Sequence, residues 1–119
     1  KTMPQCKKNP LKVNETKFLS LSLEKGRYVK RYYFSNGLGA SVVCHSGSYG
    51  GNEGLFELAI LEYDLGSDPE MTSKIIEQHP VHENHGAVDV FGWLNFSQVA
   101  DLLQEIRNYS TGNYWYEWV

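Results

Sequence analysis

The chain has 119 residues, of which 41% are hydrophobic and 21% are charged, and its formal net charge is −3. This length fits one domain with a single modest core. The composition is that of a globular protein, which excludes a largely disordered chain. No run of about 18 apolar residues occurs, which excludes an apolar membrane-spanning helix.

The charge is divided unevenly along the chain. Residues 1–52 hold nine Lys and Arg against two acidic residues, a balance of +7, and residues 53–119 hold two against twelve, a balance of −10. Such asymmetry is typical of a chain that meets a charged partner. Mutual attraction of the two halves within one compact sheet is the alternative. An acidic surface could also imitate the charge of nucleic acid and occupy a basic host protein.

Residues 1–14 are predicted to form a basic flexible tail, because Pro4 and Pro10 disfavour a helix. The remainder, residues 15–119, is predicted to form a single α+β domain. Two cysteines leave the redox state open: Cys44 lies in an apolar run and is expected to be a buried thiol. A Cys6–Cys44 bridge, which would imply an oxidising compartment, is the alternative.

Four strands are predicted in the first half of the domain. They cover Phe18–Leu23, Arg27–Phe34, Leu38–Cys44 and Leu55–Tyr63. Leucine alternates with serine in the first strand, which is typical of a half-buried strand. Gly26 and the Asn36-Gly37 pair supply turns for hairpins. The linkers are too short for a crossover helix, so the strands are expected to be antiparallel.

The polar stretch Asp64–Glu83 leaves two alternatives. Pro69 could open a short helix that covers Met71, Ile75 and Ile76. A loop followed by a strand at Ser73–Gln78 is the second alternative.

The most secure element is a helix over about Ser97–Tyr109, which follows the apolar segment Val88–Leu94. Asn95 or Ser97 can cap this helix. Its apolar residues Val99, Leu102, Leu103 and Ile106 recur at helical spacing. The expected fold is therefore α+β: an antiparallel sheet of about four to five strands packed against a C-terminal amphipathic helix, in two layers.

Aromatic residues crowd the C-terminus and suggest a partner-binding surface. Tyr and Trp are enriched in interface hot spots, and filling the core is the alternative role. The connection Ser46–Gly54 is rich in glycine and is expected to be a shaped hairpin rather than a phosphate cradle, since it lacks the lysine of such a loop. A recognition role for it stays open. The candidate partner-binding residues are Tyr49, Asn52, Tyr114, Trp115, Tyr116 and Trp118.

Three histidines at a spacing of three residues, His79, His82 and His85, are the candidate metal ligands. Imidazoles are common zinc ligands, so a metal-dependent enzyme is one alternative function. Pro80 and Gly86 indicate a loop here, and solvated loop histidines are the simpler interpretation. Cys44 and His45 are adjacent on a strand, so their side chains should diverge instead of forming a catalytic pair.

The second predicted strand interleaves basic and aromatic residues, which could bind single-stranded nucleic acid. The candidate residues are Arg27, Lys30, Arg31 and Tyr32. The acidic whole-chain charge argues against this function. A half-buried strand whose basic side chains reach the solvent is the alternative.

The central block carries a family resemblance. The runs are Ser35-Asn-Gly-Leu-Gly-Ala-Ser-Val-Val-Cys-His, Ser48-Tyr-Gly, Gly54-Leu-Phe-Glu-Leu-Ala-Ile-Leu and Asp89-Val-Phe-Gly-Trp-Leu. Over about Glu24–Asn108 the chain resembles small uncharacterised proteins of tailed phages and prophages. The resemblance brings no activity or catalytic residue. It implies a location in the host cytoplasm, which argues against a cysteine bridge.

The hypothesis that follows is a non-enzymatic phage accessory protein. It would bind and modulate a host or phage protein through an acidic surface, without catalytic residues and without a cofactor. No membrane partner is expected, nucleic acid is disfavoured, and self-association stays open. A metal-dependent enzyme or a nucleic-acid-binding protein are the alternatives.

Overall fold

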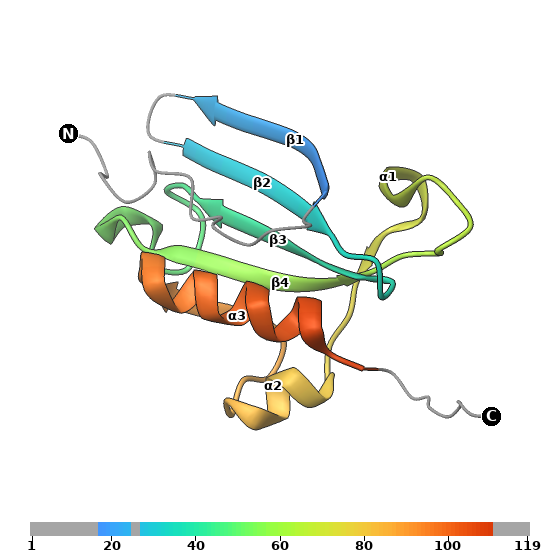
Figure 1. Ribbon diagram of the computed structural model, residues 1–119. Coiled ribbons are helices and arrows are strands. Elements are labelled where there is room, and N and C mark those ends of the chain that lie inside the picture. The colour runs from blue at the N-terminus through green and yellow to red at the C-terminus, as the bar shows by residue number, and fades with distance from the viewer. Residues whose placement is uncertain (1–16, 25–26, 111–119) are drawn as a thin grey trace.

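Four consecutive strands form an antiparallel meander that is the body of the fold (Figure 1). The computed structural model describes residues 17–24 and 27–110, and for residues 17–24 and 27 it describes only the course of the backbone. The strands are β1 (Lys17–Glu24), β2 (Arg27–Tyr33), β3 (Leu38–Cys44) and β4 (Phe56–Glu62). All four lie within a residue of the predicted positions, and their antiparallel pairing is confirmed.

Two short strands extend the sheet beyond β4. They are β5 (Lys74–Ile75) and β6 (Phe91–Leu94). In the sheet, β5 pairs with the last residues of β4 and β6 with the first, and both pairings are antiparallel. In the described part of the chain the sheet therefore has six strands, in the order β1-β2-β3-β4-β5 with β6 also on β4.

The helix α3 (Phe96–Asn108) covers one face of the sheet, as Figure 1 shows. Asn95 is its N-cap: its side chain accepts from the backbone N–H of Gln98, and the Gln98 side chain accepts from the N–H of Asn95. This capping box satisfies two amide groups at the helix start. The predicted α+β fold with its C-terminal helix is thus confirmed.

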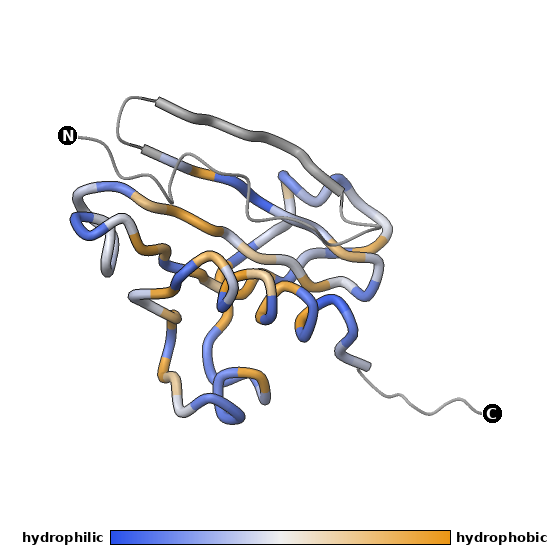
Figure 2. Tube along the Cα trace, turned by 60° about the vertical axis from the view of Figure 1, so that its left-hand side comes forward, coloured by the Kyte–Doolittle hydropathy of each residue, from blue (hydrophilic) through white to orange (hydrophobic). Residues whose placement is uncertain are grey.

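The main core lies between α3 and the sheet. It includes alternate residues of β3 and β4 and the inner face of α3: Leu38, Ala40, Val42, Phe56, Leu58, Ile60, Val99, Leu102, Leu103 and Ile106. Figure 2 shows hydrophobic residues concentrated along these central strands. Each fully buried Leu, Ile or Val stabilises the fold by about 1.5–3 kcal/mol. A second cluster of Tyr33, Leu61 and Tyr63 lies apart from the main core.

The stretch after β4 contains parts of both predicted alternatives. A short helix, α1 (Pro69–Thr72), begins at Pro69 with Asp68 as its N-cap, and the two-residue strand β5 follows it. The helix contains Met71 but ends at Thr72, so the expectation that it would also cover Ile75 and Ile76 is wrong. Ile75 lies instead in β5, which pairs with Leu61 and Glu62 of β4.

The histidine-rich segment was expected to be a loop but contains a second short helix, α2 (Pro80–Asn84). Proline at the first helical position is compatible with this start, because its missing N–H would have no partner there. Gly86 follows with φ of +68°, a conformation that favours glycine and ends the turn.

Candidate functional site

The connection between β3 and β4 is a closely packed turn. Gly50 and Gly54 adopt φ of +90° and +76° on either side of a 3₁₀ turn, η2 (Gly51–Glu53). The Ser48 hydroxyl accepts from the backbone N–H of His45 and donates to its carbonyl. A side chain at Gly51 would lie 1.7 Å from the His45 oxygen. The loop is therefore a shaped connection, as predicted.

This turn presents an exposed aromatic pair. The rings of Tyr49 and Trp93 lie with centroids 5.4 Å apart and planes inclined by 36°. Their side chains are 56% and 55% exposed. The backbone fixes the pair, because the N–H of Trp93 donates to the Tyr49 oxygen at 3.2 Å. The N–H of Tyr49 donates to Glu57 Oε1 at 2.9 Å.

Trp93 has a strained backbone. Its φ is +52°, in the left-handed region that non-glycine residues seldom occupy. Such a conformation costs about 1–2 kcal/mol. Two glycines let β6 approach the turn closely here: a Cβ at Gly50 would lie 2.9 Å from Trp93 Cα, and one at Gly92 would lie 2.8 Å from Tyr49 Cβ. Strain of this kind is concentrated at functional sites.

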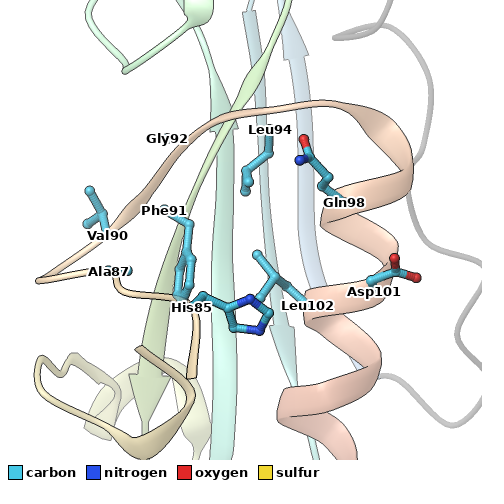
Figure 3. Close-up of a pocket in the computed structure, with 9 residues that line it drawn as sticks. All are labelled: His85, Ala87, Val90, Phe91, Gly92, Leu94, Gln98, Asp101 and Leu102. Atoms are coloured by element: carbon cyan, nitrogen blue, oxygen red, sulfur yellow. The ribbon is translucent and has the colours of Figure 1, made fainter. Parts of the chain in front are cut away.

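A cleft of about 560 Å³ lies between β6 and α3 (Figure 3), and Gly92, the neighbour of Trp93 in the sequence, is part of its lining. Ala87 and Val90 stand on one side, Gln98 and Asp101 of α3 on the other, and Phe91 and Leu94 between them. His85, Gly92 and Leu102 complete its lining. The cleft thus has an apolar interior with a few polar groups at its edge, which is the usual composition of a ligand pocket.

Asp101 lines the helical side of the cleft, and Glu105 of α3 contacts His85, which also lines it. His85 Nε2 lies 2.7 Å from Glu105 Oε1, and Asn84 donates to the other Glu105 oxygen at 3.2 Å. The hydrogen bond from His85 is the largest influence on the pKa of Glu105 and lowers it, with Asn84 adding to the effect and burial opposing it. Glu105 is therefore ionised at neutral pH. Asp101, one turn earlier on α3, is exposed.

The structure does not bring the three predicted metal ligands together. His79 Nδ1 accepts from the N–H of Val81, and His82 Nδ1 accepts from the N–H of His79. His82 is fully buried, stacks on Phe91 and bonds the Asp89 oxygen through Nε2. Within the described residues no group of three His, Cys, Asp or Glu side chains could hold a metal ion. The first two imidazoles cap α2, and the third pairs with Glu105.

The predicted nucleic-acid strand is largely buried. Lys30 is 2% exposed and Tyr32 fully buried, so neither reaches a phosphate or a base. Burial lowers the pKa of Lys30 to about 8. Among the candidate nucleic-acid-binding residues whose side chains the structure describes, only Arg31 is exposed. The side chain of Arg27 lies outside the described part of the chain.

Cys44 is buried and disulfide-bonded, so the expectation of a free thiol is wrong. It offers no nucleophile to His45, whose Nδ1 accepts from the N–H of Gly47. Cys6 lies outside the described residues. The candidate aromatic residues of the C-terminus also lie outside them: Tyr114, Trp115, Tyr116 and Trp118.

Of the predicted partner-binding residues, Tyr49 and Asn52 lie in the described structure and are exposed, whereas Trp93 and the cleft were not among the sequence-based candidates. The one local signal was the Gly92-Trp93 pair inside an apolar segment. A glycine within a strand pattern indicates a close backbone approach, and here the approach is to Tyr49.

Comparison with protein-family models, with curated proteins and with solved structures finds no match. No helix within the described ranges is long and apolar enough to cross a membrane.

Proposed function

We propose that this chain is a non-enzymatic accessory protein of a tailed phage that binds and modulates a host or phage protein. The phage assignment rests on the sequence resemblance. The binding role rests on the exposed, backbone-fixed pair of Tyr49 and Trp93.

The aromatic pair is the observation that carries the proposal. Tyr and Trp contribute large contact area at low cost in conformational entropy, and they dominate interface hot spots. Trp93 keeps more than half of its surface exposed although its backbone is strained. Neither exposure nor strain stabilises the monomer, and both support the proposal that this pair contacts a partner.

The charge of the domain supports a basic partner. Residues 28–110 contain four Lys and Arg and eleven acidic residues, a balance of −7. Many of the carboxylates are exposed, among them Glu53, Glu62, Asp64, Asp89 and Asp101. Complementary charge accelerates association and makes it sensitive to salt.

The test is capture of a partner with matched variants. The wild-type protein, Trp93→Ala and Met71→Ala are immobilised, and host lysate, with and without phage infection, is passed over each at low salt. Met71 is also an exposed hydrophobic residue, but it lies on α1. We expect a protein that wild type and Met71→Ala retain, that Trp93→Ala loses, and that binds the wild type with measurable affinity once purified. Equal retention by all three, or no specific protein at all, would overturn the proposal.

The disulfide at Cys44 bears on the proposed location. The resemblance implies the host cytoplasm, where thiols are kept reduced, whereas disulfides persist in oxidising compartments. Thiol labelling of protein taken directly from infected cells distinguishes the cytoplasm from an oxidising compartment. The protein is denatured before labelling, because Cys44 is buried. A Cys44 that is then labelled agrees with the cytoplasm, and one that is labelled only after reduction places the protein in an oxidising compartment.

A further inference from the structure

We propose that the cleft between β6 and α3 binds a basic peptide segment of the partner, with an arginine whose apolar stem lies on the cleft interior and whose guanidinium meets Asp101. This inference rests on the proposed function and names the chemistry that the partner must present.

The size and interior of the cleft fit a peptide segment. Its volume of about 560 Å³ is within the roughly 300–1,000 Å³ typical of ligand pockets. Phe91, Leu94 and Leu102 line it, and each still exposes some surface, between 5% and 8%. A long basic side chain buries its methylene stem on such a surface while its charged end stays in water.

The charge at the edge of the cleft selects a cation. Asp101 lines the cleft and is exposed. Glu105 follows it by four residues on α3, so the two carboxylates lie on the same side of the helix. No Lys or Arg is among the nine residues that line the cleft in the described structure. A planar guanidinium can bond a carboxylate through two N–H groups, which favours arginine over lysine.

The cleft and the aromatic pair meet at β6. Gly92 lines the cleft, and the space in front of its α-carbon is occupied by Tyr49, 2.8 Å from where a Cβ would lie. The next residue is Trp93. A partner chain that packs on the two aromatic rings therefore lies next to a residue that lines the cleft.

The test uses three blocked tripeptides: acetyl-Leu-Arg-Leu-amide and its counterparts with Gln or Glu in the centre. Each is titrated into the full-length ¹⁵N-labelled protein at low salt. We expect the arginine peptide to shift the amide signals of Phe91, Gly92, Asp101 and Leu102. It should bind about fivefold more tightly than the glutamine peptide, which corresponds to about 1 kcal/mol, the upper range for an exposed ion pair. The glutamate peptide should bind most weakly.

Variants test whether the preference for the arginine peptide arises in the cleft. Asp101→Asn should abolish the arginine preference, and Glu70→Gln, which removes one exposed carboxylate from α1, should leave it unchanged. Ala87→Leu should weaken the arginine and glutamine peptides alike by narrowing the cleft. Unchanged dispersion of the amide spectrum verifies that each variant is folded.

Equal binding of the three peptides, signal shifts confined to residues away from the lining of the cleft, or a preference that survives Asp101→Asn would overturn the inference. Its failure is separable from that of the proposed function. If Trp93→Ala loses the captured partner while the peptides show no preference, the cleft inference fails and the binding function stands. If the preference is found but Trp93→Ala still captures the partner, the cleft stands and the aromatic pair does not carry the function.

Discussion

The side-chain amide of Asn36 donates to the backbone oxygen of Ile106 at 2.9 Å, although one residue lies in the turn between β2 and β3 and the other near the end of α3. The same Nδ2 lies 3.0 Å from the oxygen of Tyr109. Asn36 Oδ1 accepts from the N–H of Leu38. Carbonyl groups at the end of a helix lack partners within it. A single asparagine therefore shapes the hairpin and holds the C-terminal end of α3 against the sheet.

Replacing Asn36 with Ala should lower the free energy of unfolding by about 1–3 kcal/mol, because part-buried carbonyl groups of α3 lose their donor. Asn36→Asp should cost at least as much, since a carboxylate would face those carbonyls. Urea denaturation followed by circular dichroism measures both. Ser35→Ala, an exposed neighbour in the same turn, is the control and should change stability by less than about 0.5 kcal/mol. Equal stability of Asn36→Ala and wild type would refute the role of this amide.

The fold was predictable wherever local chemistry and tertiary packing agree. The Leu38–Cys44 run alternates between faces as a strand, and Asn36-Gly37 precedes it as a turn. The α3 helix carries both its cap, Asn95, and its apolar stripe in the sequence. The local sequence could not decide between a helix and a strand after β4, because β5 forms by pairing with Leu61 and Glu62.

The candidate site was predictable only in part, because it joins residues that are distant in sequence. Tyr49 meets Trp93 because β6 returns to pair with the start of β4, where Phe56 lies opposite Leu94. No local pattern specifies that return. For the histidines the sequence predicted a site that the structure does not form. An imidazole that accepts a hydrogen bond from a backbone N–H, as His82 does, cannot be told from a metal ligand by sequence.

Stability should fall as the solution is acidified below about pH 6.5, in part through His79. Burial is the largest cause that lowers its pKa below the usual value of 6.5, nearby His82 lowers it further, and Glu62 opposes the shift. The unfolded chain then binds the proton at a higher pH than the folded one. The free energy of unfolding therefore decreases as pH falls through the folded pKa. Protonation also removes the Nδ1 acceptor that caps α2.

The measurement is urea denaturation from pH 8 to pH 5 for wild type and His79→Asn. Asparagine caps helices without titrating, so this variant should match wild type at pH 8 within about 0.5 kcal/mol and show a shallower decline on acidification. Parallel curves for the two proteins would show that His79 has no part in the pH dependence.

Between pH 8 and pH 9.5 the free energy of unfolding should depend on the ionisation of Lys30. Burial lowers its pKa from 10.5 to about 8, so in this interval the unfolded chain binds more protons than the folded one. The free energy of unfolding should therefore rise with pH. Burial raises the pKa of Tyr28 to about 12. Above pH 10 this tyrosine therefore ionises in the unfolded chain first, and the free energy of unfolding should fall with pH. In Lys30→Met the rise should disappear, and a slope equal to that of wild type would contradict this origin.

Comparing Trp93→Gly with Trp93→Ala should separate the effect of backbone strain on stability from the effect of the aromatic ring on binding. Trp93→Gly removes the aromatic ring but relieves the strain of φ +52°, whereas Trp93→Ala removes the ring and keeps the strain. We expect Trp93→Gly to be more stable than Trp93→Ala by about 1 kcal/mol, measured by urea denaturation. Both should lose the partner. If Trp93→Ala is as stable as Trp93→Gly, position 93 is not strained, and its backbone gives no support to a binding role.

Gly92→Ala should disturb the aromatic pair without removing either ring. The new Cβ would lie 2.8 Å from Tyr49 Cβ, too close for ordinary contact, so Tyr49 or the turn that carries it must move. The protein labelled with 5-fluorotryptophan reports this directly: the ¹⁹F signal of Trp93, assigned through Trp93→Phe, should shift in Gly92→Ala. Gly66→Ala is the matched control, because nothing lies within 4 Å of a Cβ there. Partner affinity should fall with Gly92→Ala alone, since the proposed binding surface depends on the spacing of Tyr49 and Trp93. An unshifted signal with weakened binding would instead place the effect in the cleft that Gly92 also lines.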